Sequence, residues 1–70
     1  MTTATASYFF AAGYRFYIGS YSGESLAEDF EEIFEALTIE DNPEEEWLYV
    51  ESVRIDEAAH EVHIFIGNDE

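Results

Sequence analysis

Carboxylates are the side chains that dominate the possible chemistry of this chain. Asp and Glu account for 17 of its 70 residues, against two Arg and no Lys, and the formal net charge is −15. The first acid is Glu24, and most of the acids fall in the stretch that follows: Glu24, Glu28, Asp29, Glu31, Glu32, Glu35, Glu40, Asp41, Glu44, Glu45, Glu46 and Glu51. Because self-repulsion of this kind opposes a compact fold, we expect the acidic stretch to have a function. The simplest one is to occupy a protein surface that binds nucleic acid.

Several of the acids recur at helical spacing. Residues three and four apart are neighbours on a helix, about 5–6 Å from one another, and this spacing joins Glu28, Glu31, Glu32 and Glu35. Duplex DNA presents one negative charge per about 1.7 Å of its axis, which an acidic helix and loop can approximate over a short stretch. A solvated helix face is the alternative, but ordinary surfaces intersperse both signs of charge. The residues predicted to bind a partner are Glu24, Glu28, Asp29, Glu31, Glu32, Glu35, Glu40, Asp41, Glu44, Glu45, Glu46, Trp47 and Tyr49.

Other kinds of site are disfavoured by the residues present. The glycine-rich segment 19–25 resembles a phosphate loop, but Glu24 stands where a Lys is needed. The acidic loop 41–46 lacks the EF-hand glycine and carries Pro43 at its third position. His60 and His63 are three apart in a predicted strand and so project to opposite faces, and there is no Cys. We therefore expect no metal and no cofactor. An enzyme using a carboxylate with either His ranks third among the hypotheses.

The composition predicts a folded protein in spite of its charge. Hydrophobic residues make up 47% of the chain and aromatic residues 17%, which is unlike a disordered segment. We expect one domain over residues 1–70, with residues 1–6 frayed. There is no apolar run of membrane-spanning length and no signal-peptide pattern, so we expect a soluble cytoplasmic protein. Its acidity disfavours direct binding to nucleic acid or to an anionic membrane.

The predicted elements position these acids around one small sheet. Residues 7–21 read as two strands joined near Ala12-Gly13, and residues 38–46 as a loop. A helix is expected to begin at Ser25, with Glu28 completing a capping box, and to present an apolar stripe of Leu26, Phe30, Ile33, Phe34 and Leu37. Residues 46–55 and 60–66 read as strands around a turn at 56–59. Their expected pairs are Ile55 with Val62 and Val53 with Ile64, with a bulge near Glu51-Ser52.

These elements predict an α+β fold, a small antiparallel sheet with one helix packed on one face, in the order ββαββ. One helix covers only one side of a sheet. The other side is expected to expose an aromatic patch of Tyr8, Phe10, Tyr17, His63 and Phe65. A patch of this kind suggests a partner or a homodimer.

The whole chain resembles a class of proteins in composition. A short chain, an acid-loaded helix, almost no basic residues and an aromatic-rich sheet are similar to the DNA-mimicking anti-defence proteins of phages and mobile elements, which include anti-CRISPR and antirestriction proteins. Locally, the segment 17–21 (Tyr-Ile-Gly-Ser-Tyr) followed by 23–26 (Gly-Glu-Ser-Leu) is similar to the start of ArdA-type antirestriction proteins. The resemblance implies inhibition by occupying a DNA-binding groove, through the acids between Glu24 and Glu46.

Two hypotheses of different classes follow. The first is a non-enzymatic inhibitor, in the cytoplasm of an infected bacterial host, that binds the Lys/Arg-lined nucleic-acid channel of a CRISPR effector or a restriction enzyme. Trp47 and Tyr49 would supply apolar anchors beside the acids. The second is a small structural or assembly module, which could form a homodimer through its aromatic sheet face. Its acidity would then serve solubility or adaptation to a saline cytoplasm. Dependence of folding on molar salt would favour the second.

Overall fold

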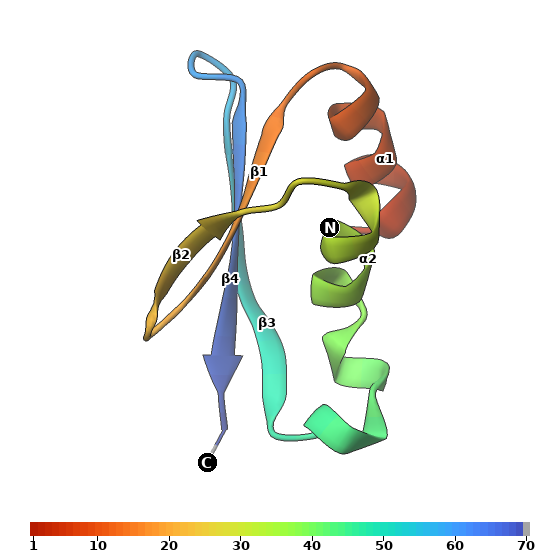
Figure 1. Cartoon of the computed structure of the whole chain (residues 1–70), viewed down its shortest axis with the longest axis vertical. Helices are drawn as coiled ribbons and strands as arrows, with labels where there is room; N and C mark the ends of the chain where they lie inside the picture. The colour runs from red at the N-terminus through yellow and green to blue at the C-terminus, as the bar shows by residue number, and fades with distance from the viewer. Residues whose placement is uncertain (70) are drawn as a thin grey trace.

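The computed structural model describes residues 1–69 and has an α+β fold, a four-stranded mixed sheet with two helices on one of its faces (Figure 1). Its elements, in chain order, are α1 (Thr3–Ala11), β1 (Arg15–Ser20), β2 (Gly23–Leu26), α2 (Phe30–Leu37), the 3₁₀ turns η1 (Ile39–Asp41) and η2 (Pro43–Glu45), β3 (Leu48–Asp56) and β4 (Glu61–Asn68). Within residues 1–69, neither helix has the length and apolarity needed to cross a bilayer.

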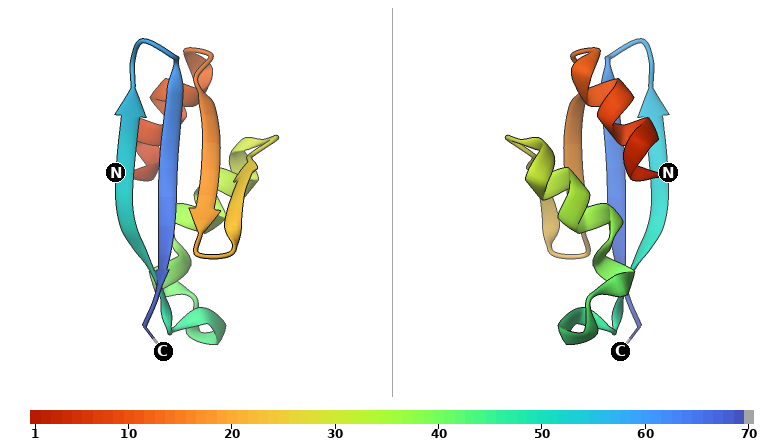
Figure 2. Two further views of the ribbon diagram at one scale, coloured as in Figure 1. Left: turned by 90° about the vertical axis from the view of Figure 1, so that its left-hand side faces the viewer. Right: turned by 90° about the vertical axis from the view of Figure 1, so that its right-hand side faces the viewer.

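The sheet has the strand order β2-β1-β4-β3, and its central pair, β1 and β4, is parallel (Figure 2). The outer pairs β1–β2 and β3–β4 are antiparallel hairpins. The predicted all-antiparallel sheet in ββαββ order was therefore wrong. The chain crosses the sheet through α2, η1 and η2 and forms β3 at the far edge. The returning β4 fills the centre, where Val62, Ile64 and Ile66 are buried.

The first helix replaces the frayed end and the first strand that the sequence predicted. Thr2 is its N-cap, with the side-chain oxygen accepting a hydrogen bond from the Thr5 amide at 3.1 Å. Ala6 is completely buried against the sheet. The aromatic residues that suggested a strand lie all around α1, which has no clear polar face. Tertiary packing and a capped, Ala-rich start outweigh their β propensity.

Gly13 ends this helix instead of forming a hairpin turn. Its φ of +90° lies in the region that glycine adopts without strain. The Tyr14 amide donates to the Phe9 carbonyl and the Gly13 amide to the Phe10 carbonyl, each at 3.1 Å. This pair of hydrogen bonds is a Schellman motif. A glycine serves a hairpin and a helix end equally well, which is why the local sequence did not separate them.

The second helix begins four residues later than the sequence predicted. Its N-cap is Asp29, whose side chain accepts a hydrogen bond from the Glu32 amide at 3.1 Å, while Glu32 accepts one from the Glu28 amide at 2.8 Å. The predicted cap, Ser25, lies with Leu26 in β2 instead. Each candidate N-cap is followed three residues later by a Glu, so the local pattern is the same at both. The pairing of β2 with β1 keeps Ser25 in a strand and leaves Asp29 as the N-cap.

The core lies between the helices and the inner face of the sheet. Its fully or nearly fully buried side chains are Ala6, Phe16, Ala27, Ile33, Ala36, Val62, Ile64 and Ile66. Two residues of the predicted helical stripe are outside it, because Leu26 and Phe34 are each 48% exposed. The eight-residue α2 therefore buries a narrower stripe than predicted, centred on Ile33.

The β3–β4 hairpin is the part that the sequence predicted best. Ile55 pairs with Val62 and Val53 with Ile64, as expected, and the register shifts between Val50 and Ser52, where the bulge was predicted. A bulge there brings the residues before it back onto the core-facing side.

Candidate functional site

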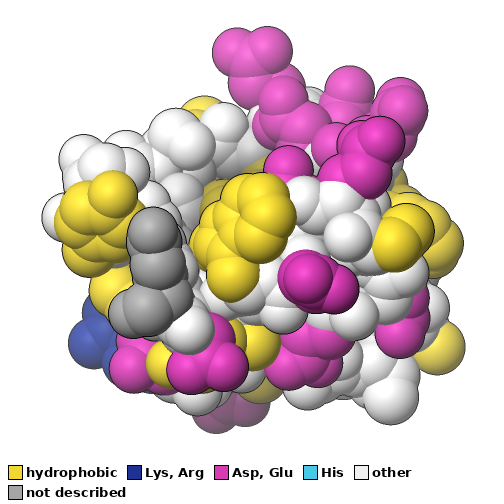
Figure 3. Space-filling view, turned by 90° about the horizontal axis from the view of Figure 1, so that it is seen from below, with side chains coloured by type: hydrophobic (Ala, Val, Ile, Leu, Met, Phe, Trp, Pro, Cys, Tyr) yellow, Lys and Arg dark blue, Asp and Glu magenta, His cyan; other side chains and the backbone are white. Residues whose placement is uncertain are grey.

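The helix side of the molecule carries nearly all the acids predicted to bind a partner. We call this set the acidic face: Glu28, Asp29, Glu31, Glu32, Glu35, Glu40, Asp41, Glu44, Glu45 and Glu46. All are exposed except the half-buried Glu45. Seen from below, many acidic side chains gather at the upper right of the view, and others lie along its lower part, some of them next to the visible basic side chain (Figure 3). These acids lie on or directly beside the consecutive elements α2, η1 and η2.

Local capping holds the loop part of the acidic face in shape. The Asn42 side chain accepts a hydrogen bond from the Glu44 amide at 2.9 Å, and Pro43 occupies the first position of η2. Thr38 donates from its hydroxyl to the Phe34 carbonyl at 2.8 Å at the end of α2. The loop carboxylates are therefore attached to ordered turns, not to a flexible tail.

The acidic face is not neutralised from within the molecule. Among residues 1–69, no carboxylate of the acidic face forms an ion pair. Both arginines lie on strands of the sheet, Arg15 in β1 and Arg54 in β3. The hydrogen bonds that Asp29 and Glu32 accept come from backbone amides. Unpaired carboxylates at this density create a field that attracts cationic surfaces.

Aromatic side chains lie exposed within or beside the acidic face. Phe34 is 48% exposed on α2, one turn from Glu31, and Trp47 is 47% exposed directly after Glu46. Phe34 was predicted to be in the core, so its exposure adds an apolar contact that the sequence did not suggest. Tyr49, the second predicted anchor, is half-buried on β3 and packs on Gly67.

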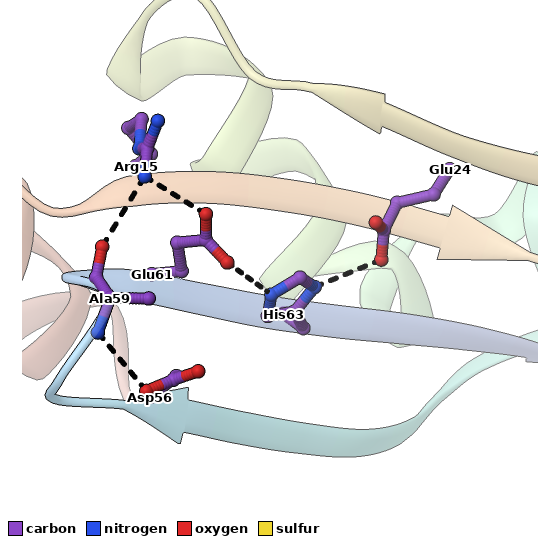
Figure 4. A network of polar contacts seen from close by, with 6 residues as sticks. All are labelled: Arg15, Glu24, Asp56, Ala59, Glu61 and His63. Carbon is purple, nitrogen blue, oxygen red and sulfur yellow. Dashed lines mark hydrogen bonds and ion pairs between the residues drawn. The ribbon is translucent and has the colours of Figure 1, made fainter.

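The opposite side of the sheet, which we call the open face, has no helix over it (Figure 2, left). Its centre is a network of charged side chains (Figure 4). Arg15 donates to Glu61 at 2.9 Å, and the two ring nitrogens of His63 lie 3.0 Å from Glu24 and 3.2 Å from Glu61. The ring of Tyr17 stacks on that of His63, with centroids 5.0 Å apart and planes 12° apart. This network links three neighbouring strands.

Glu24 belongs to the open face and not to the acidic face where the sequence placed it. It sits opposite Gly19 in the β1–β2 pairing, and its carboxylate passes 3.6 Å from the place that a Cβ of Gly19 would take. Glu24 on β2 crosses over β1 at this position and reaches His63 on β4.

The network changes the protonation of its histidine. The hydrogen bond to Glu24 raises the pKa of His63 above its ordinary value of 6.5, with a further increase from Glu61, while burial and the charge of Arg54 oppose it. Protonated His63 donates a hydrogen bond from each ring nitrogen, and its positive charge offsets part of the negative charge of Glu24 and Glu61. The alternation of β4 places Glu61 and His63 on one face, but the adjacency of β4 and β1 that completes the network was not readable from the sequence.

The predicted aromatic patch is divided between the two sides of the sheet. Tyr17, His63 and Phe65 lie on the open face, whereas Tyr8 and Phe10 are on α1. The other histidine, His60, lies in the β3–β4 turn with its ring 4.9 Å from that of Tyr14. In residues 1–69, no three His, Asp or Glu side chains converge on a position that could hold a metal ion.

We found no protein family, no curated protein and no solved structure that matches this chain. Its function is therefore inferred from the geometry of the acidic and open faces.

Proposed function

We propose that this chain is an acidic inhibitor that imitates DNA and occupies the basic nucleic-acid-binding surface of a host defence complex, a CRISPR effector or a restriction enzyme. One observation carries the proposal. The acidic face gathers exposed carboxylates on α2, η1 and η2, with no cation paired to any of them in residues 1–69. A surface that served only solubility would gain from interspersed Lys and Arg, which reduce self-repulsion.

The mechanism is competition for one basic surface. The field of the acidic face steers the chain toward a Lys/Arg-lined channel, where the carboxylates take the places of phosphates. Phe34 and Trp47, each nearly half exposed, then supply apolar contacts that phosphates lack. Such anchors slow dissociation once water is excluded from them.

The second candidate is a small assembly module that dimerises through the open face. The observation that favours it is the uncovered apolar surface there, where Leu26 is 48% and Phe65 37% exposed. Light scattering on the purified chain tests this candidate. A dimer that separates when Phe65 is changed to Ser would support it, and a monomer at all concentrations would contradict it.

The inhibitor proposal is tested with a panel of purified CRISPR effector complexes and restriction enzymes. Each is loaded with labelled DNA, and the chain is added at low and at high salt. We expect displacement of the DNA from at least one complex, weakened by salt because the contacts are charged. If no complex releases DNA at any salt concentration, the proposal is wrong.

A further inference from the structure

The helices leave one edge of the sheet incompletely covered. α2 crosses the sheet obliquely, so the lower ends of β1 and β2 extend beyond it (Figure 2, right). A groove runs between β2 and α2 and continues beside the β1–β2 hairpin. It consists of two adjoining hollows of about 510 Å³ and about 540 Å³, both lined by Ile18, Ser25 and Ile66.

The floor and the rim of this groove differ in chemistry. Core and near-core side chains form the floor, among them Ile18, Ile66 and Ala36. The rim on the α2 side is acidic and carries Glu28, Glu32 and Glu35. Within residues 1–69, none of these three carboxylates has a cation partner, and only Glu32 accepts a hydrogen bond.

We propose that this groove is the docking site for an amphipathic segment of a protein partner, which places an apolar side chain on the floor and flanking Lys or Arg side chains against Glu28 and Glu35. This inference rests on the proposed function and names the part of the basic partner that the chain recognises. Charge complementarity selects the occupant, because the apolar floor favours a hydrophobic side chain and the rim requires positive charge beside it.

Other occupants fit the groove less well. Nucleic acid is repelled by the rim carboxylates. A second copy of this chain contains no Lys, and its two Arg lie on the sheet, Arg15 already paired with Glu61. An uncharged apolar ligand would fill the floor but leave the rim as repulsive as before. A basic and apolar segment satisfies both parts of the groove.

The direct test compares two labelled peptides of equal charge by fluorescence anisotropy. In one peptide Val and Lys alternate, and in the other Ser replaces each Val. We expect the Val-containing peptide to bind tighter by roughly tenfold, the factor that burial of one Val side chain supplies. The preference should persist at high salt, because the apolar contact is not screened. Equal affinity of the two peptides would overturn the inference.

Two matched variants locate the binding on the groove. Ser25 faces Ile18 across the β1–β2 pair, so Ser25→Trp should fill the groove and remove the preference for Val. Ser52→Trp places the same residue on β3, opposite Phe65 and away from the groove, and should leave the preference intact. If Ser25→Trp folds, by circular dichroism, and keeps the preference, the groove is not the site.

A neutral rim variant provides an independent measurement. Glu28→Gln with Glu35→Gln removes two charges without changing size, and should weaken the Val–Lys peptide by roughly tenfold. The same change at Glu51 and Glu57, both exposed and outside the groove, should have a much smaller effect. Failure of the proposed function is distinguished by the DNA-displacement assay. If the chain displaces DNA but binds the two peptides with equal affinity, only the groove proposal is wrong. If it prefers the Val-containing peptide but displaces no DNA, only the inhibitor proposal is wrong.

Discussion

The acidic face and the open face hold their carboxylates in opposite ways. On the open face, Glu24 and Glu61 are joined to His63, and Glu61 also to Arg15, so that each carboxylate helps to link strands. On the acidic face no carboxylate has a cation within residues 1–69, although the charge density there is higher. Arg15 and His63 thus form their ion pairs where these connect strands of the sheet. The comparison indicates that the open face is built for stability and that the charge of the acidic face is available to a partner.

The two faces should also differ in what their charges contribute to folding. Exposed ion pairs stabilise a protein by about 0–1 kcal/mol, and the open-face network lies partly shielded, with the side chain of His63 only 19% exposed. The unpaired carboxylates of the acidic face repel one another and oppose folding.

Packing on the open face should be the most sensitive feature. A Cβ added to Gly67 would lie 2.5 Å from the ring of Tyr49, so Gly67→Ala should lower the free energy of unfolding by about 1–3 kcal/mol, measured by urea denaturation. Gly19→Ala is the matched control, because its Cβ would make ordinary 3.6 Å contacts with Glu24. Equal destabilisation by the two variants would mean that the contact with Tyr49 is not what matters.

Charge reversal on the acidic face should abolish most partner binding and leave the fold intact. Glu31→Lys with Glu44→Lys changes two exposed side chains whose carboxylates accept no hydrogen bond from any of the described residues 1–69. We expect affinity for a basic partner to fall roughly tenfold or more, by DNA displacement. Glu51→Lys with Glu57→Lys makes the same change in charge outside the acidic face and should do much less. If both pairs act alike, only the net charge matters and the distribution of acids has no role.

Removal of Glu24 should lower the pKa of His63. The hydrogen bond from His63 to Glu24 is the main cause of its raised pKa, so Glu24→Gln should bring the value back toward 6.5, as followed by NMR titration of the ring protons. An unchanged titration would show that the network does not persist in solution.

The same network makes stability depend on pH with a definite sign. Because the pKa of folded His63 is raised above 6.5, its contribution to stability is fully present below about pH 6.5, the unfolded value, and is lost as the pH rises through the folded pKa. The difference in unfolding free energy between the wild type and His63→Gln should therefore shrink over that interval. A difference that grows with pH would contradict this assignment.

Salt should have the smallest effect, and it also tests the halophilic alternative. Screening reduces repulsion on the acidic face, so moderate salt should raise the melting temperature slightly. The increase should be smaller in the double variant Glu31→Lys with Glu44→Lys, because it has less repulsion to screen. A chain that folds in dilute buffer favours a specific function for its charge. A chain that needs molar salt to fold would favour adaptation to a saline cytoplasm.

The parts of the fold that were predicted correctly depend on short-range patterns. Alternation of β-branched residues around a tight turn predicts the pairing of Val53 with Ile64, and the phase change at Glu51-Ser52 predicts the bulge. The acids of the acidic face could be grouped in advance because they are close together in the chain. The open-face network could not, since Arg15 and Glu61 come together only through the parallel pairing of β1 with β4.

The α+β composition, the β3–β4 hairpin and the concentration of acid between Glu24 and Glu46 follow from the spacing of neighbouring residues, so they can be read from the chain alone. The places of these elements in the fold depend instead on contacts between distant segments. Asp29 is the cap of α2 instead of Ser25 because β2 pairs with β1. Glu24 lies apart from the other acids because the pairing of β2 with β1 brings its carboxylate to His63. In each case, hydrogen bonds and packing between distant segments choose among local conformations of similar free energy.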